Sequence, residues 1–279
     1  MNTLSTEKRK MVVGALVEGN SIRATVRMTG VAKKTVMRIL CEVGKACWEY
    51  QQKSLVNLPC KRIECDEIWS FCYAKDRNLP EGKRDKWGYG SVWTWTAICA
   101  DTKIVPCWFI GQRDIHASNA FMRDLADRVS DQVQITTDGH NTYLQAVLGA
   151  FGRNANYGQI VKRYRAMPGI TEGKYSPGEC VSSYSMHVSG NPDADHISTS
   201  CVERQNLTMR MSMRRFTRLT NGFSKKIQNL QWAVSLHFMN YNFCRIHSSL
   251  RVTPAMAAKV TNKVWEIEDV LALAYGISK

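Results

Sequence analysis

The succession of hydrophobic patterns from residue 62 to residue 152 restricts the fold of this chain more than any other feature. It begins with three runs rich in β-branched and aromatic residues, at 62–71, 91–100 and 104–110. Such runs, bounded by turn-forming residues, are typical of strands, and the ADTK segment between the last two favours a tight turn. We therefore predict three antiparallel strands that follow one another along the chain.

Helical and strand patterns alternate after these runs. Phe121, Leu125 and Val129 recur every four residues and predict a helix. A short strand is expected at 133–138, and a second helix over 141–152 ends at a glycine. Three strands, a helix, a strand and a helix are the order of a mixed sheet flanked by helices.

The chain is strongly basic. It has 38 lysines and arginines against 24 aspartates and glutamates, a net charge of +14. Residues 1–64 hold 12 basic and 5 acidic side chains, and so half of the net charge. A hydrophobic share of 44% excludes disorder of the whole chain. A folded protein with this balance favours a polyanionic partner, and nucleic acid is the first candidate.

Membrane and zinc signals are weak in this sequence. No apolar run approaches the ~20 residues of a membrane span, and the N-terminus lacks the apolar core of a signal peptide. We expect a cytoplasmic protein without a membrane partner. The ten cysteines include no C-x-x-C pair, and Cys60, Cys65 and Cys72 lack a nearby histidine that would complete a zinc site. Buried, reduced thiols are the expectation.

Residues 5–50 have the pattern of three helices. The first stops at Gly19, Ser21 can cap the second, and Gly30 supplies the turn into the third. The inward residues are expected to be Met11, Val12, Ala15, Leu16, Ile22, Val26, Val36, Leu40 and Val43. The outward basic residues of the third helix are Lys33, Lys34 and Arg38. This is a helix-turn-helix arrangement; a bundle that binds protein has the same pattern, but the basic excess favours DNA.

Two acids stand where surface charges are uncommon. Asp66 lies inside the first strand among apolar residues, where a carboxylate is costly without compensation. Asp138 ends the fourth strand, and Gly139 after it allows a substrate to approach closely. In this topology the first and fourth strands are neighbours, so the two carboxylates would meet and require a cation between them. Glu67, one residue along, is expected on the opposite face of the strand.

A third acid, Glu203, stands in the polar run ISTSCVERQN. The basic residues that follow it are Arg204, Arg210, Arg214, Arg215, Arg218, Lys225 and Lys226. Taken alone, such a run is explained equally well by a solvated helix face. Asp193 and Asp195 lie in the turn-forming sequence GNPDAD and are interpreted as loop acids, and His196 as a hydrogen-bonded loop histidine.

The segments CDEIWSF, TTDGHNTY and STSCVERQN resemble the three acidic motifs of the DDE transposases of bacterial insertion sequences, in particular the insertion-sequence-one type. The resemblance runs from about residue 62 to 258 and includes SGNPDADHIS and YNFCRIHSSLRVTPAMA. It implies a mixed α/β chain with a ribonuclease-H-like catalytic domain of the retroviral-integrase superfamily, whose mixed sheet has five strands, and an all-α N-terminal helix-turn-helix domain. Several relatives carry an N-terminal zinc-binding element, which this sequence lacks.

The resemblance also implies roles for individual residues. Asp66, Asp138 and Glu203 would hold two divalent ions, Mg²⁺ or Mn²⁺, that serve cleavage of element ends and transfer of their 3′-hydroxyls into target DNA. Asp66 would bridge both ions, while Asp138 and Glu203 would each hold one. Arg204, Arg210 and Arg214 would face phosphates. The implied partners are double-stranded DNA and further copies of the chain in a synaptic complex.

We predict a helix-turn-helix domain at 1–55, a catalytic domain at 60–258 and a helical tail without assigned function at 259–279. An apolar spacing after residue 222 predicts a long helix that packs on the catalytic domain, and Thr253-Pro254 begins another helix. Two other classes stay open. One is a DNA-binding regulator that keeps the fold without the chemistry, and the other is a metal-dependent nuclease or resolvase that does not join strands.

Overall fold

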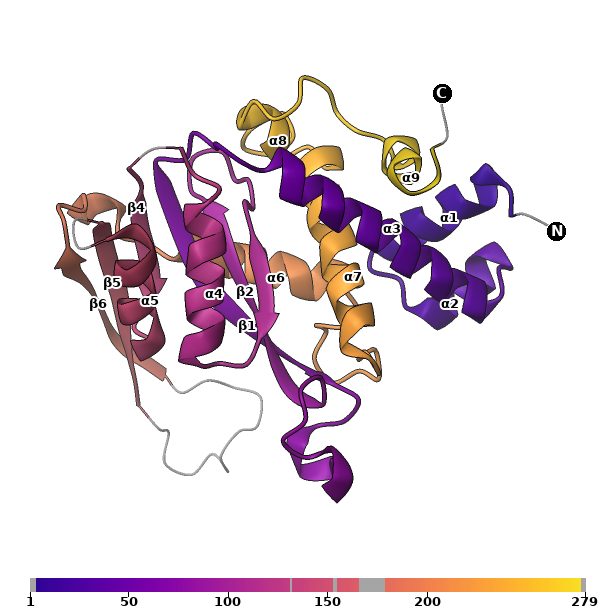
Figure 1. The fold of residues 1–279 in the computed structure, drawn as a ribbon, viewed down its shortest axis with the longest axis horizontal. Helices are drawn as coiled ribbons and strands as arrows, with labels where there is room; N and C mark the ends of the chain where they lie inside the picture. Colours follow the sequence, from indigo (N-terminus) through magenta and orange to yellow (C-terminus); the bar gives the residue numbers. More distant parts are fainter. Residues whose placement is uncertain (1–3, 131, 153–154, 166–178, 277–279) are drawn as a thin grey trace.

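The computed structural model describes residues 4–130, 132–152, 155–165 and 179–276 (Figure 1). Its helices are α1 (Thr6–Val17), α2 (Ile22–Thr29), α3 (Lys33–Ser54), α4 (Ile115–Ala126), α5 (Asn141–Phe151), α6 (Ser200–Ser212), α7 (Ile227–Met239), α8 (Pro254–Ala257) and α9 (Ile267–Tyr275). Its strands are β1 (Arg62–Cys72), β2 (Gly90–Cys99), β3 (Trp108–Gly111), β4 (Gln134–Asp138), β5 (Asn156–Arg165) and β6 (Glu179–Ser189). A π-helical turn, Asn240–Cys244, continues α7.

The strands form one mixed sheet in the order β3-β2-β1-β4-β5-β6. Strand β1 is central, antiparallel to β2 and parallel to β4, which confirms that the first and fourth strands are neighbours. The expectation of five strands is wrong, because β6 returns antiparallel beside β5 and makes a sixth. The sequence of β6 is ECVSSYSMHVS, and its side chains from 180 to 187 are exposed. An exposed edge strand has no buried face to maintain, so no apolar alternation marks it.

Two predicted elements are shorter than their apolar patterns. The third strand begins at Trp108 rather than at residue 104, because Pro106 has no N–H group for the ladder. Helix α4 ends at Ala126, and Val129 instead forms an isolated bridge with Leu58. The other helices and strands predicted between residues 62 and 152 are confirmed.

Helices cover both faces of the sheet (Figure 1). Helices α4 and α5 pack on one face, where Phe121 and Tyr143 contact the fully buried Trp95 of β2. Helix α6 packs on the other face, against β1 and β2. Strand β1 therefore has one face toward α5 and the opposite face toward α6, which decides the environment of every acid that it carries.

The three N-terminal helices form as predicted. The Ser21 hydroxyl accepts the Ala24 N–H (3.0 Å), and Gly30 adopts a left-handed conformation (φ 68°) that ends α2. Met11 is 46% exposed, against expectation, because the buried side of α1 is formed by Val12, Val13, Ala15 and Val17. Lys33, Lys34 and Arg38 are exposed on α3. Their contact with DNA stays a prediction.

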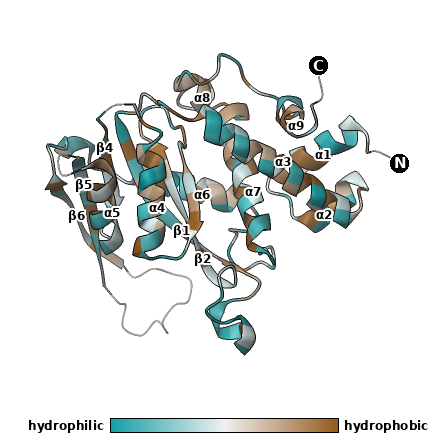
Figure 2. Cartoon of the chain, in the orientation of Figure 1, coloured by the Kyte–Doolittle hydropathy of each residue, from teal (hydrophilic) through white to brown (hydrophobic). Residues whose placement is uncertain are grey.

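The N-terminal helices share a hydrophobic core with the C-terminal segment (Figure 2). Gly44 of α3 lies so close to Trp232 of α7 that a Cβ atom would collide with it. Helix α9 packs on α3, and its Tyr275 donates a hydrogen bond to Glu42 (2.7 Å). The residues after 259 thus help to hold α3 in place. The boundaries of a separate DNA-binding domain stay a prediction.

The two predicted C-terminal helices are confirmed, but α7 packs mainly on α3 rather than on residues 60–258 as expected. Helix α7 buries Leu230, Val234 and Phe238, and the Thr253 side chain caps α8 by accepting the Met256 N–H (3.2 Å). Cys60, Cys65 and Cys72 are buried thiols. Within the described residues, no helix has both the length and the apolar character that a membrane span requires.

Candidate metal centre and nucleic-acid interface

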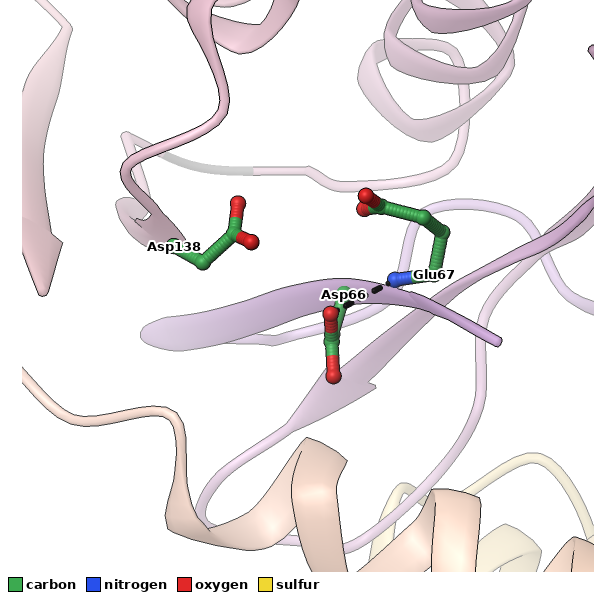
Figure 3. A group of neighbouring side chains, drawn as sticks. All are labelled: Asp66, Glu67 and Asp138. Carbon is green, nitrogen blue, oxygen red and sulfur yellow. Dashed lines mark hydrogen bonds between the residues drawn. The ribbon is translucent and has the colours of Figure 1, made fainter. Parts of the chain in front are cut away.

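Strand β1 carries acids on both of its faces. Side chains alternate along a strand, so Glu64 and Asp66 share the face toward α6 and Glu67 lies on the face toward α5. Their hydrogen bonds follow this division, because Glu64 and Asp66 contact residues of α6 while Glu67 contacts Tyr143 of α5. The opposite orientation predicted for Glu67 is confirmed, and Figure 3 shows Asp66 and Glu67 extending from opposite sides of the strand.

Asp138 lies beside these two acids at the end of β4. Cys65 pairs with Thr137 in the parallel ladder, so the next residues along each strand, Asp66 and Asp138, are adjacent. Single carboxylate oxygens of Asp66, Glu67 and Asp138 all lie within 4.8 Å of one another (Figure 3). The His140 amide donates to Asp138 Oδ1 (3.0 Å) and fixes that carboxylate. The three acids form a group that could hold a metal ion.

Asp66 lies in a strongly unfavourable field. Burial, followed by the negative charges of Glu67 and Asp138, raises the pKa of Asp66 to about 7. Two hydrogen bonds reach its carboxylate, from the Glu67 amide (2.8 Å) and from the Asn206 side chain (2.8 Å). Both donors are neutral, so they satisfy the oxygens without balancing their charge. A divalent cation would supply the missing charge.

Glu67 is neutralised within the fold. Its side chain is 1% exposed, and its two oxygens accept hydrogen bonds from Arg113 Nε (2.6 Å) and from the Tyr143 hydroxyl (2.9 Å). Burial and the nearby Asp138 raise the pKa of Glu67, and the Arg113 charge opposes them. Glu67 therefore has a charge partner and a complete set of contacts without a metal ion. Arg113 also lies 3.9 Å from Asp138 Oδ2.

Glu64 anchors α6 to the sheet. One oxygen of this buried carboxylate accepts the amides of Cys201 (2.7 Å) and Val202 (3.1 Å), in the first turn of α6. The unpaired N–H groups and positive dipole end of a helix make its N-terminus a favourable place for a carboxylate. The sequence interpretation missed this acid. The sequence marks Glu64 in the same way as Asp66. Both are carboxylates in the same apolar strand, and Glu64 lies two residues before Asp66.

Glu203 is on α6 but outside the group of three acids. Its carboxylate forms an ion pair with Lys162 of β5 and accepts a hydrogen bond from Thr199 (2.7 Å). Its negative charge still contributes to the raised pKa of Asp66. The structure thus brings Asp66 and Asp138 together and holds Glu203 on the adjoining helix. Lys162 was not identified from the sequence, in which nothing marks it as a partner of Glu203.

The side of α6 that faces Asp66 also carries Asn206 and Arg210. Burial, and then the charge of Arg218, lowers the pKa of Arg210, while the negative charge of Asp66 opposes both. Arg204 is exposed and lines a different cavity, of about 350 Å³, with Lys103 and Arg245. Arg214 is exposed beyond the end of the helix. The predicted phosphate-binding arginines therefore do not form one continuous row.

The loop before α6 agrees with its interpretation from the sequence. Asp193 caps a short 3₁₀ turn by accepting the Asp195 amide (3.1 Å), and its second oxygen is hydrogen-bonded to His196 (2.6 Å). These side chains stabilise the turn.

The donor atoms present fit a hard divalent cation. Asp66 and Asp138 offer carboxylate oxygens, which Mg²⁺ and Mn²⁺ prefer. Beside them, the amide oxygen Oδ1 of Asn206 is buried and accepts no hydrogen bond from the described residues. The group contains neither thiol nor imidazole, so the ligand set is unlike that of a zinc site.

Neither the family models nor the curated proteins compared with this chain contain a match. Among solved structures, the chain is similar to a chain of the crystal structure of the Mos1 strand transfer complex, with 10% sequence identity and a TM-score of 0.24. The match covers 100% of this chain and 82% of that one. A TM-score this low supports no conclusion on fold or function, so the proposals below depend on the site itself.

Proposed function

We propose that the chain is a DNA transposase of the DDE type, which cleaves the ends of a mobile element and joins them to target DNA. The observation that carries this proposal is the pair Asp66 and Asp138. These carboxylates are adjacent on parallel strands, and within the described residues the hydrogen-bond donors to Asp66 are neutral. An enzyme that binds divalent ions there accounts for a fold that holds these like charges together.

The third ligand in this proposal is Glu203 rather than Glu67. Glu67 is balanced by Arg113 and Tyr143, whereas Glu203 is 47% exposed and is held by a lysine side chain that can move away. Glu64 fixes the start of α6, so Glu203 would stay on the helix beside Asp66 if a metal ion took the place of Lys162.

Two bound divalent ions would activate the attacking oxygen and stabilise the leaving one. In the cleavage step, a water oxygen bonds to phosphorus as the bond to the 3′ oxygen breaks, which leaves a 3′-hydroxyl on the element. In the joining step, that hydroxyl attacks a target phosphodiester and displaces another 3′ oxygen. Asp66, Asp138 and Glu203 would hold those ions beside the reacting phosphate, and Arg210 would contact the DNA next to it.

DNA binding is assigned to the basic face of α3 and to the arginines of α6. Lys33, Lys34 and Arg38 are exposed and could reach phosphates. Two element ends must be held together for joining, so we include a homo-oligomer in the proposal.

A second candidate function is favoured by one contact. The ion pair of Lys162 with Glu203 neutralises the proposed third ligand without a metal ion. A DNA-binding regulator that keeps the fold but lacks the chemistry would retain such a pair.

The test is cleavage of the DNA that flanks the gene, with Mg²⁺ or Mn²⁺ and with a chelator. Asp66→Asn, Asp138→Asn and Glu203→Gln should each abolish metal-dependent cleavage and leave DNA binding intact. Glu67→Gln is the matched control and should still cleave. Wild-type protein that is inactive with every divalent ion, or an Asp66→Asn variant that cuts as well as wild type, would favour the regulator. Cleavage without joining would favour a nuclease or resolvase.

A further inference from the structure

One edge of β1 is uncovered beyond the acidic site. The parallel ladder with β4 ends at the pair Cys65 and Thr137, whereas β1 continues to Cys72. Cys72 then forms a bridge with Ser224, and the Tyr73 amide donates to the Ser224 carbonyl (2.8 Å). Because β2 occupies the other edge, this bridge lies on the edge that β4 has left. No described strand pairs with that edge between residues 66 and 71.

A cavity of about 730 Å³ lies beside this part of β1. Its walls are the end of β1, residues 73–75, 77 and 78 after it, Arg210 of α6, and residues 215–221 and 223. Trp69 is 39% exposed, and its ring centroid lies 5.7 Å from that of Phe71. The Phe71 ring in turn packs on Phe223, with 4.8 Å between the ring centroids. The Trp69 indole N–H donates to Ser91 (2.9 Å), so the ring is held in place with part of its surface free. The cavity therefore has a fixed aromatic wall.

Among the described residues, the charged side chains that line the cavity are all basic. They are Lys75, Arg77, Arg210, Arg215 and Arg218. Arg215 is largely buried, and its Nε donates to the Ser224 hydroxyl (2.7 Å), a neutral partner. Within the described parts of the chain, neither Arg210 nor Arg215 forms an ion pair with a carboxylate. A buried guanidinium without an acid is costly, and an anionic ligand would remove that cost.

We propose that this cavity binds an unpaired stretch of DNA strand, with a base stacked on Trp69 and the phosphates held by Arg210 and Arg215. Aromatic surfaces combined with a cationic groove are the combination that binds single strands without sequence readout. Arg210 lies one turn after Asn206, which donates a hydrogen bond to Asp66, and Trp69 follows Asp66 on β1, so the cavity and the acidic site are adjacent. The inference rests on the proposed function, since the strand in the cavity would be the one that leaves the acidic site.

The test measures equilibrium binding of the full-length protein to labelled DNA in the presence of a chelator, so that no cleavage occurs. Three probes share one duplex: the first is blunt, the second has an oligothymidine tail, and the third has an abasic tail of the same length. The thymidine tail should bind more tightly than the abasic tail, by roughly fivefold to a hundredfold per stacked base. Equal affinity for the two tails in the wild type would overturn the proposal.

Two pairs of variants locate the effect. Trp69→Ala should abolish the preference for the thymidine tail, whereas Trp87→Ala, which replaces a tryptophan that is 52% exposed outside the cavity, should keep it. Arg77→Ala should weaken binding of both tailed probes and not of the blunt duplex, while Arg84→Ala on the same loop should change neither. Arg77 is exposed, so this second pair decides the matter even where Trp69→Ala fails to fold.

The outcomes also separate this inference from the proposed catalysis. A thymidine preference that depends on Trp69 supports the cavity even in a protein that cleaves no DNA. Metal-dependent cleavage without any tail preference would overturn the cavity and leave the catalytic proposal intact. The cavity proposal would also be overturned if the Trp69 and Trp87 variants had the same preference for the thymidine tail, or if the Arg77 and Arg84 variants bound the tailed probes equally well.

Discussion

Asp66 and Glu67 are consecutive acids on one strand, yet the two faces of β1 treat them differently. On the face toward α5, Glu67 is paired with Arg113 at 2.6 Å and bonded by the Tyr143 hydroxyl. On the face toward α6, the donors to Asp66 in the described part of the chain are an amide N–H and the Asn206 side chain, both of which are neutral. Among the described residues, a charged partner contacts Glu67 and none contacts Asp66.

This difference separates a structural carboxylate from a functional one. A buried charge that serves only the fold gains a partner, because an unpaired one costs stability. A buried charge without a partner is retained where a ligand supplies the opposite charge, as at metal sites and catalytic sites. The comparison predicts that the two acids differ in how strongly the protein responds to pH, to their substitution and to the loss of their nearest arginine.

The largest expected effect is on the pH dependence of stability. The pKa of Asp66 is raised from 3.8 to about 7, so between these values the folded protein keeps a proton that the unfolded chain has lost. Stability therefore falls as pH rises from about 4 to 7, by on the order of 4 kcal/mol for this group. In chelator, Asp66→Asn should be more stable than wild type at pH 8, and this advantage should disappear at pH 4.

Denaturant unfolding of both proteins at each pH measures this effect. The pKa values of Glu64 and Glu67 are raised as well and add a decrease of the same sign, but both proteins carry those acids. The difference between the two unfolding curves therefore isolates Asp66. A constant difference between pH 4 and pH 8 would show that the charge of Asp66 is compensated within the fold without a metal ion.

A smaller effect is expected when Glu67 loses its partner. Arg113→Ala leaves a carboxylate that is 1% exposed with only the Tyr143 hydroxyl, and so gives Glu67 the situation of Asp66. We expect a loss of about 1–3 kcal/mol at pH 8, the cost of an unsatisfied buried group. The loss should be smaller at pH 5, where Glu67 can take up a proton. Tyr143→Phe, which removes one hydrogen bond to Glu67 and no charge, is the control that separates the loss of a hydrogen bond from the loss of the counter-charge.

Local sequence patterns were sufficient for most of the fold. Ser21, Gly30 and Thr253 identify helix ends because each acts within four residues of its own position. The apolar surroundings of Asp66 and the strand end at Asp138 are also local, and the neighbouring strands bring these two acids together as expected.

The parts that the sequence did not reveal depend on contacts between distant segments. Glu64 contacts an amide 137 residues away, and Lys162 pairs with Glu203 across 41 residues. Periodicity specifies which face a side chain occupies and not which residue lies opposite. For the same reason, the sequence indicated that Asp66 and Glu67 have different faces but not that Arg113 neutralises only one of them.

The smallest effect on stability is expected at Arg210, the arginine on the Asp66 side of the strand. Burial and the charge of Arg218 lower the pKa of Arg210, so its charge adds little to the stability of the DNA-free protein. The charge of Arg113, in contrast, is paired with Glu67. Arg210→Ala should change the free energy of unfolding by no more than about 0.5 kcal/mol, as for a residue outside any packed ion pair. Strand joining should nevertheless fall, because the contact to the reacting DNA is lost.

Arg113→Ala, measured in parallel, should show the larger loss of stability. If Arg210→Ala instead lowered the melting temperature as much as Arg113→Ala, Arg210 would be the structural partner of Asp66, and the two faces of β1 would be equivalent.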